Sequence, residues 1–563
     1  MPAQLSIEPD ASRGAPPSPT VHQFRQSLLW PLRLLPVVAP AGGPRRQPWQ
    51  WLTEPWRQTA DEYTGASADF HERHYQEFVT FLPYVQRFLY GEGRATRGPG
   101  VRNVESPMRV FRRHDVAAVR VEARPGDAPV TLSVVHIDLY FFFDVDLVLL
   151  NVELAAEHIT LAQSQELLYR LGRGYPAGWD ADGHTLHAPT RVEWLDKSGA
   201  VLTRSDAQER ERFMAHVCEH RAPRIAADWA FLLQPLVSDH SGEPGLLRFR
   251  QIEYYRMPLM AYLSLDDPRA LSRSDFVRLG LVAGAAGPSA ASEASGNLPF
   301  SEQHLADFEQ RFCYDRFWTA SGAAPHTRYL CSGHALVVVG PANSHFFCCA
   351  DRGVLSQFRH QHFLLFLIAH FQKAALLMFS DRLVEALQGL DVGDTGSVRR
   401  FKRAIRGSFE GFLRFTHRYW FHEVAEQAQT RALFKMCVSH LGVDALYGEV
   451  KERIRDMSDY LDADSLRRQA NTVVRLTVVT IFGLIGTVTT GFLGMNLLAE
   501  ADSPLSRRLA IFGTVFTITS ALTVYTMVKS KRLSDFLDAL SDERLTVWQK
   551  IKSLGAVWRH SDD

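Results

Sequence analysis

Two uncharged stretches near the carboxyl end decide the fold of this chain. They read 476-LTVVTIFGLIGTVTTGFL-493 and 509-LAIFGTVFTITSALTVYTMV-528, and they hold 18 and 20 residues. An α-helix needs about 20 predominantly apolar residues to cross the hydrocarbon core of a bilayer. We therefore expect two transmembrane helices, over 476–493 and 509–528, and a short loop that joins them into a hairpin.

Basic residues around the two expected spans predict their orientation. The cytoplasmic flanks of membrane helices carry an excess of lysine and arginine. Six basic residues flank the spans on the side of the chain termini: Arg467, Arg468, Arg475, Lys529, Lys531 and Arg532. The joining loop has only Arg507 and Arg508, together with the acidic Glu500 and Asp502. We expect a multi-pass protein of the cell (inner) membrane, with both termini in the cytoplasm.

Three long helices are expected between residue 360 and the end of the first span. They cover residues 363–387, 398–440 and 443–493, where the sequence has almost no proline. The first contains an apolar run, but His370, Gln372 and Lys373 interrupt it, so we expect a buried core helix and not a third span. The last would continue without a break from the cytosol into the membrane, as a stalk.

The sequence before residue 360 predicts a mixed α/β (α+β) cytosolic domain. Residues 131–154 are rich in β-branched and aromatic side chains and alternate in polarity, which indicates a pair of strands or one long bent strand. Thr160 and Gln163 have the spacing of a capping box at the start of a helix over 161–171. Residues 335–340 read as a further strand.

Five regions follow from these patterns. Residues 1–55 are expected to form a mobile tail, because eight prolines precede residue 41. Within this region, the apolar patch from Leu28 to Val38 is interrupted by prolines and reads as a short strand or a tethered segment of the tail. The other regions are the α/β domain at 56–360, the long cytosolic and stalk helices at 361–472, the transmembrane hairpin at 473–528, and a basic cluster with a cytosolic helix at 529–563. Within the α/β domain, residues 284–297 are of low complexity and are expected to form an exposed loop.

Composition excludes several other classes of protein. Lysine and arginine number 62 and aspartate and glutamate also 62, so the chain lacks the basic excess of a nucleic-acid-binding protein. The six cysteines read as reduced thiols, and the patterns at His216–Cys218–His220 and Cys331–His334 lack a second ligand pair at zinc-site spacing. Enzyme signatures such as a phosphate loop or a nucleophile elbow are missing. We expect neither an enzyme nor a resident cofactor.

Small residues crowd the outer half of the first span and leave two interpretations open. Gly483, Thr487 and Gly491 recur at four-residue spacing, which permits close helix packing. One interpretation is a packing face between the two helices of the hairpin. The other is the wall of a narrow pore that offers hydroxyl and carbonyl groups.

The first span ends in Gly494-Met495-Asn496. This tripeptide at the outer end of the first of two carboxyl-terminal spans resembles the signature of CorA-type magnesium transport proteins. The resemblance is specific over about 430–533 and architectural before that. It implies a funnel-shaped homopentamer in a lipid bilayer, with the first membrane helices lining a central pore and Gly494, Met495 and Asn496 at its selectivity mouth.

Several residues fall on functional positions of that family. The resemblance places Thr487 and Gly491 in the pore lining and Leu484 and Leu476 at apolar constrictions. It places Asp459 at a stalk site that senses cytosolic magnesium. Two departures concern residues next to these: Leu493 stands where the family usually has tyrosine, and Ile485 where it often has proline.

The chemistry of Asn496 fits a pore for hydrated divalent ions. Magnesium gives up its water slowly, so a ring of amide oxygens that binds the water shell would admit it without dehydration. We expect transport of magnesium, with cobalt or nickel as further substrates, gated by cytosolic divalent cation. A zinc transporter of the same family and a membrane-tethered sensor or scaffold without conduction remain the alternatives.

Overall fold

A computed structural model describes most of the chain. The described residues are 19–36, 47–59, 72–91, 107–142, 145–253, 255–285, 300–391, 394–494, 504–507, 509–519, 521–522 and 525. In 461–493 several residues are described by their backbone alone. The chain divides into two compact units, residues 1–452 and 453–563.

The first unit is built on one large sheet with a small second one. The strands are β1 (Thr20–Leu34), β2 (Trp56–Gln58), β3 (Met108–Arg113), β4 (Ala118–Glu122), β5 (Val130–Phe142), β6 (Leu147–Thr160), β7 (Gly178–Trp179), β8 (Thr185–Leu186), β9 (Arg191–Leu195), β10 (Val201–Arg204), β11 (Val237–Ser238), β12 (Arg248–Gln251), β13 (Leu259–Leu265), β14 (Cys313–Tyr314), β15 (Arg328–Cys331) and β16 (Ala335–Pro341). The expected mixed α/β domain is therefore present.

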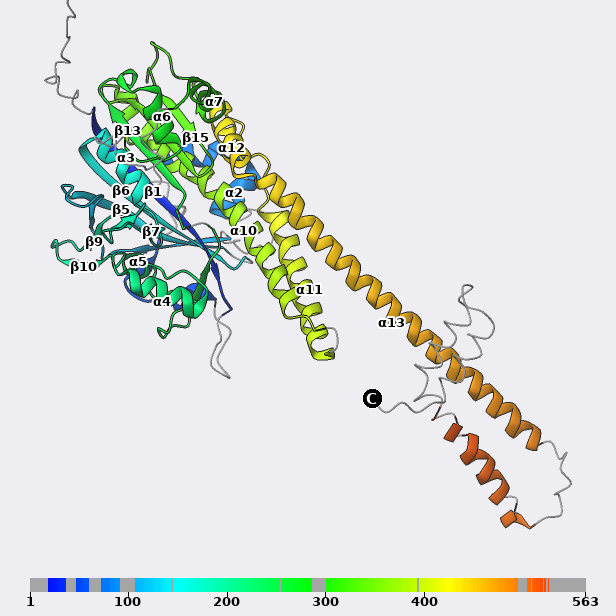
Figure 1. The fold of residues 1–563 in the computed structure, drawn as a ribbon. Helices are drawn as coiled ribbons and strands as arrows, with labels where there is room; N and C mark the ends of the chain where they lie inside the picture. Colours follow the sequence, from blue (N-terminus) through cyan, green and yellow to red (C-terminus); the bar gives the residue numbers. More distant parts are fainter. Residues whose placement is uncertain are drawn as a thin grey trace, which may run out of the picture. The chain divides into compact units, whose positions relative to one another are not determined.

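Helices cover this sheet and continue beyond it. They are η1 (Pro48–Trp51), α1 (Glu72–Thr80), α2 (Pro83–Tyr90), α3 (Leu161–Arg170), α4 (Arg210–His220), α5 (Ala227–Leu233), η2 (Pro268–Ala270), α6 (Arg273–Gly280), α7 (Glu302–Phe312), α8 (His345–Cys348), α9 (Val354–Gln357), η4 (Phe358–His362), α10 (Phe363–Gln388), α11 (Thr395–Arg418), α12 (Ala428–Leu441) and α13 (Val443–Gly494). Figure 1 shows their arrangement within the first unit.

The central strand of the large sheet corrects the predicted tail at 1–55 and agrees with the short strand that was one interpretation of the apolar patch at 28–38. The order is β10-β9-β4-β5-β6-β1-β13-β16-β15-β14, and β1 lies between β6 and β13. Strand β1 pairs with β6 from Thr20 to Arg33 and with β13 from Val21 to Leu28. Residues 1–18 and 37–46 lie outside the described part of the chain.

The position of Pro31 explains how a central strand can contain a proline. On one side of β1 the ladder to β13 ends at Leu28, and the ladder to β12 starts at Leu32. Pro31 falls in the gap between them, where its missing N–H leaves no ladder hydrogen bond unmade. A strand can therefore form here, although a proline in the sequence argues against a central strand.

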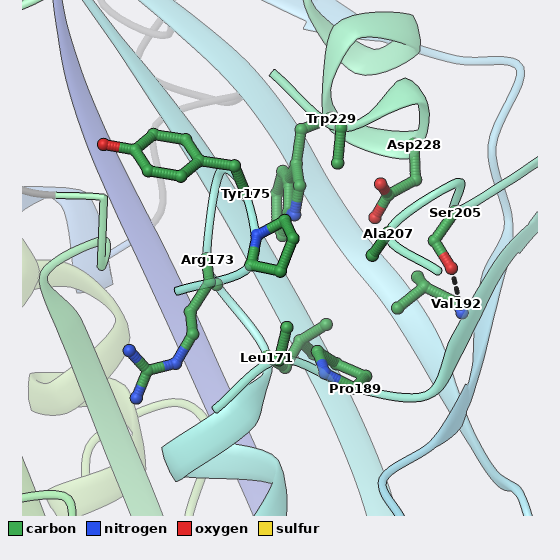
Figure 2. Close-up of a pocket in the computed structure, with 13 residues that line it drawn as sticks. Leu171, Arg173, Tyr175, Pro189, Val192, Ser205, Ala207, Asp228 and Trp229 are labelled. Carbon is green, nitrogen blue, oxygen red and sulfur yellow. Dashed lines mark hydrogen bonds between the residues drawn. The ribbon is translucent and has the colours of Figure 1, made fainter. Parts of the chain in front are cut away.

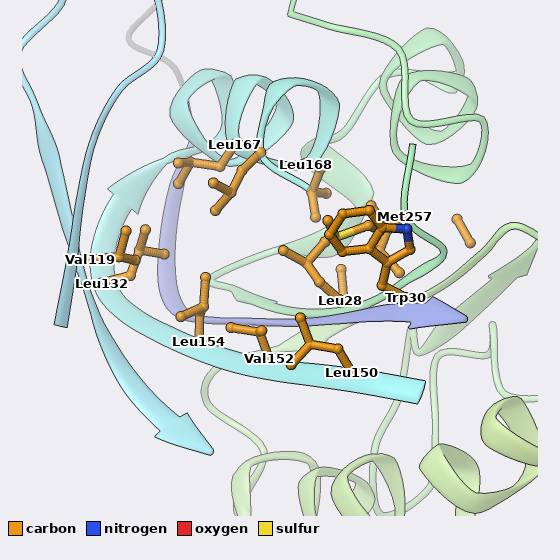
Figure 3. Close-up of a cluster of buried hydrophobic side chains, with 14 of the residues drawn as sticks. Leu28, Trp30, Val119, Leu132, Leu150, Val152, Leu154, Leu167, Leu168 and Met257 are labelled. Carbon is orange, nitrogen blue, oxygen red and sulfur yellow. The ribbon is translucent and has the colours of Figure 1, made fainter. Parts of the chain in front are cut away.

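One face of the sheet packs against α3 and α5. Leu28 and Trp30 of β1 and Val152 of β6 point to this side, toward Leu167 and Leu168 of α3 (Figure 3). The expected capping box sets the start of α3: the Thr160 hydroxyl accepts from the Gln163 N–H at 3.1 Å, and Gln163 Oε1 accepts from the Thr160 N–H at 2.9 Å. The predicted strands over 131–154 and 335–340 are confirmed as β5, β6 and β16.

The other face packs against α10, which confirms the prediction of a core helix. Phe371 stacks on Phe142 of β5 with ring centroids 4.0 Å apart. Among the described residues, one helical stretch, Val354–Gln388, is long and apolar enough to cross a membrane, and 83% of its most apolar window is buried. The expected span at 509–528 includes residues outside the described set, and within 476–493 several residues are described by their backbone alone.

Two features of the helical region differ from the sequence prediction. Helices α10 to α12 belong to the same compact unit as the sheet, so residue 360 is not a domain boundary. The helix expected over 398–440 is broken into α11 and α12. The break contains no proline or glycine, but its carbonyl groups accept hydrogen bonds from other parts of the chain. The Leu82 N–H donates to the Val424 carbonyl at 2.9 Å, and Gln372 Nε2 donates to the Tyr419 carbonyl at 3.1 Å.

The last predicted helix is confirmed as α13, which runs for 52 residues from Val443 to Gly494. It follows α12 directly, because Gly442 adopts the left-handed conformation (φ 66°) that ends α12. Residues 286–299, which include most of the low-complexity stretch, and the carboxyl-terminal 526–563 lie outside the described part.

A buried ion-pair cluster joins the α10 side of the sheet to the turn that leads into α10. Glu153 of β6 is 5% exposed. Its Oε1 accepts from Arg359 Nε at 2.9 Å and from Arg25 Nη1 at 3.3 Å. Burial lowers the pKa of Arg25, and the Glu153 carboxylate opposes that shift. The two guanidinium groups therefore share one carboxylate.

Candidate functional site

The apolar end of α13 carries the residues that the sequence assigns to a pore. Leu476 is 67% exposed, and Thr487, Gly491 and Gly494 are also exposed within the described chain. Leu484 lies on the same helix, and its backbone alone is described. Met495 and Asn496 follow directly and lie outside the described residues, so the structure does not test their place at a pore mouth.

Threonine hydroxyls in both apolar segments are paired within their own helices. Thr487 Oγ1 donates to the Gly483 carbonyl at 2.8 Å and Thr480 Oγ1 to the Leu476 carbonyl at 2.8 Å. Thr514 and Thr517 in the second segment make the same bond four residues back. Without water, each polar group in a bilayer needs an internal partner. The exposed hydroxyls are thus satisfied by the backbone of their own helices.

The second apolar segment packs against α13 at one glycine. Residues 505–507 and 509–519 are helical, and this segment appears in orange in Figure 1. A methyl group built on Gly486 would lie 2.6 Å from Cγ2 of Thr519. At Gly483 or Gly491 it would meet no described atom within 4 Å. Among the described residues, the two apolar segments therefore meet at Gly486.

This contact bears on the two interpretations of the small residues. Among the described residues, a methyl group on Gly483 or Gly491 meets no atom of the second segment, and Thr487 and Leu476 are exposed. Sequence reasoning missed Gly486 as the contact residue, because Gly483 and Gly486 lie within one turn of each other and only the partner helix distinguishes them.

The contact predicts that Gly486→Val destabilises the carboxyl-terminal unit. Any Cβ would clash with the Thr519 methyl group, and overpacking of this kind costs about 1–3 kcal/mol. We expect a smaller yield of folded protein. When samples in mild detergent are heated and then separated by size exclusion, the temperature at which half of the folded peak is lost should be lower.

The matched control is Gly513→Val, which adds the same side chain to the second segment. A methyl group built on Gly513 would meet no described atom within 4 Å, so this variant should behave like the unmodified protein. Equal loss in the two variants would show that valine itself, and not the contact with Thr519, causes the effect.

Asp459 lies on α13 as a surface carboxylate. Its side chain is 70% exposed, and Arg455 Nε lies 3.8 Å from its Oδ2, one helical turn away. Among the described residues of a single chain, no group of three histidine, cysteine or acidic side chains could hold a metal ion.

The metal-like sequence patterns lie in the first unit. His216 and His220 line an open pocket of about 390 Å³, with ring centroids 4.5 Å apart, and Cys218 is exposed. Cys331 is buried, and burial lowers the pKa of His334 to about 3, with Arg256 and Lys373 adding to the effect. A histidine that stays neutral in this way fits a core position.

A second buried acid lies beside a small cavity. Burial raises the pKa of Asp228, in the first turn of α5, to about 7. Its carboxyl group lies near Ser205, whose hydroxyl accepts from the Val192 N–H at 3.0 Å (Figure 2). The cavity they line measures about 10 Å³, room for about one water molecule. It is too small for an organic substrate.

Comparison with known proteins gives no relative. The chain matches no protein-family model, no curated protein and no solved structure. The resemblance to CorA-type proteins therefore depends on the Gly-Met-Asn tripeptide, its position and the pattern of the two apolar segments.

Proposed function

We propose that this chain is a CorA-like channel or transporter for divalent metal cations, with magnesium as its first substrate. The observation that carries the proposal is the position of Gly494-Met495-Asn496, which begins at the last residue of α13, after an uncharged stretch of 18 residues. The open face at Leu476, Thr487 and Gly491 supports it, since a pore lining has to be free of the second segment.

The proposal includes a membrane location with both termini in the cytoplasm. Exposed apolar side chains continue along both segments and would be unfavourable in water. The side chains with the largest exposed fractions are Val473, Leu476, Leu505, Leu509, Phe512, Phe516, Ile518 and Leu522. A bilayer or further copies of the chain would cover them.

Conduction requires several copies, because two helices cannot enclose a pore. The family resemblance gives five. In such an assembly Leu476 and Leu484 would form apolar constrictions that close by dewetting, and Asn496 amides would bind the water shell of the ion. Glu500 and Asp502 would raise the local cation concentration.

A flux assay tests the proposal. The full chain is reconstituted in liposomes that contain a magnesium-sensitive dye, and a magnesium gradient is applied. We expect dye signal that depends on the protein. The zinc alternative predicts signal with zinc and a zinc dye but little with magnesium. The scaffold alternative predicts no flux of either ion, and that result would overturn the proposal.

Feedback by magnesium gives a second test. Five Asp459 carboxylates on neighbouring stalks would repel each other, and a bound cation would offset this repulsion in the closed state. We expect Asp459→Asn to raise the internal magnesium concentration needed for half-inhibition by about fivefold, the equivalent of one surface ion pair.

Asp444→Asn serves as the control, since Asp444 is exposed in the first turn of the same helix. Its inhibition curve should match that of the unmodified protein. An unchanged curve for Asp459→Asn would move the sensing role to other carboxylates, such as Asp456 or Asp462.

A further inference from the structure

Helix α11 has two faces of different chemistry. Its buried side, with Phe401, Ile405, Phe412 and Phe415, packs on α10, and Phe412 lies edge-on to Phe379 with centroids 5.6 Å apart. Figure 1 shows α11 alongside α10. Helical spacing places the opposite face in solvent.

The outward face is strongly basic. Residues 395–418 contain seven lysines and arginines and one acid, Glu410, a surplus of six positive charges in a chain with no net charge. Arg399, Arg403 and Arg406 recur at spacings of four and three, are exposed, and make no ion pair with any described carboxylate. The charges of these three arginines are thus not neutralised by any described carboxylate.

Two large apolar side chains lie exposed among these arginines. Phe409 is 36% exposed and Leu413 is 40% exposed. A helix with cationic and apolar side chains on one solvent-facing surface is typical of binding at an anionic membrane interface, where the apolar groups enter the boundary between headgroups and acyl chains.

We infer that the outward face of α11 binds the anionic phospholipid surface of a membrane. Arg399, Arg403 and Arg406 would bind phosphate groups, and Phe409 and Leu413 would enter the interface. This role goes beyond the proposed conduction and concerns the first unit alone. Each basic residue near an anionic surface raises the association constant by about fivefold, so the three together raise it by about a hundredfold.

Hydrogen exchange of the full chain in nanodiscs tests this inference. One preparation contains phosphatidylcholine alone, and the other is rich in phosphatidylglycerol. We expect exchange in peptides covering 399–418 to be about tenfold slower with the anionic lipid at low salt, and the difference to shrink at high salt.

A charge-matched pair of variants completes the test. Arg399→Gln/Arg403→Gln/Arg406→Gln should lose the lipid-dependent protection. The control Arg210→Gln/Arg212→Gln/Arg221→Gln removes three exposed arginines at α4 and should keep it.

Three outcomes would overturn the inference: equal exchange in the two lipids, equal protection in both triple variants, or protection by added RNA duplex in place of lipid. Failure of the membrane anchor is distinguishable from all three, because the protein would then not co-elute with the nanodiscs that contain phosphatidylcholine alone.

Discussion

Replacement of Asn496 by alanine is expected to reduce magnesium uptake in liposomes to background, a loss of at least about tenfold. Each amide that binds the water shell of the ion contributes about 1 kcal/mol. In a symmetric assembly every copy acts on the same ion, so the contributions add and their joint loss removes recognition. The measurement is initial uptake rate at equal amounts of reconstituted protein.

Two controls accompany this variant. Leu497→Ala changes the next residue and should leave uptake near normal. Asn496→Asp keeps an oxygen ligand but adds charge, so the ion should be held more tightly and released more slowly. Size exclusion must show the same assembly for all variants. Near-normal uptake by Asn496→Ala would remove Asn496 from the proposed pore mouth, whatever the flux of the unmodified protein.

Glu153→Ala is expected to destabilise the first unit by about 3–5 kcal/mol, the cost of leaving buried charges without their partner. Arg25 and Arg359 would then face each other across the space that the carboxylate fills. The measurement is the unfolding midpoint in detergent, read by tryptophan fluorescence, because nine of the eleven tryptophans precede residue 453.

The control lies on the same strand. Glu157 of β6 is exposed, and Glu157→Ala should change stability by no more than about 0.5 kcal/mol. A second step separates charge from packing: Glu153→Ala/Arg359→Met removes one of the two stranded cations and should recover part of the loss. No recovery would show that the cavity left by the shorter side chain, and not the uncompensated charge, sets the cost.

Local patterns predicted much of the helical structure. The capping box at Thr160 and the uninterrupted helix from Val443 depend on residues a few positions apart, so a sequence window contains the information needed. The buried character of α10 followed from His370, Gln372 and Lys373 within one apolar run. The pore residues at 476–496 came from a resemblance, and their role still depends on the flux experiments.

Long-range pairing decided the rest. Strand β1 looked like part of a proline-rich tail, because its partners β6 and β13 are more than a hundred residues away and only they show that Pro31 falls in a gap of the ladder. The break between α11 and α12 depends on contacts with Leu82 and Gln372, which no local window contains.

By itself, the sequence determined where the chain is apolar, where helices start and which segments could cross a bilayer, because these properties belong to short stretches of residues. Only the tertiary structure decided that Gly486, and not Gly483, meets the second apolar segment, and that the basic face of α11 is the one left in solvent. Both depend on which side of a helix a distant element covers, and a periodic pattern alone is compatible with several such partners.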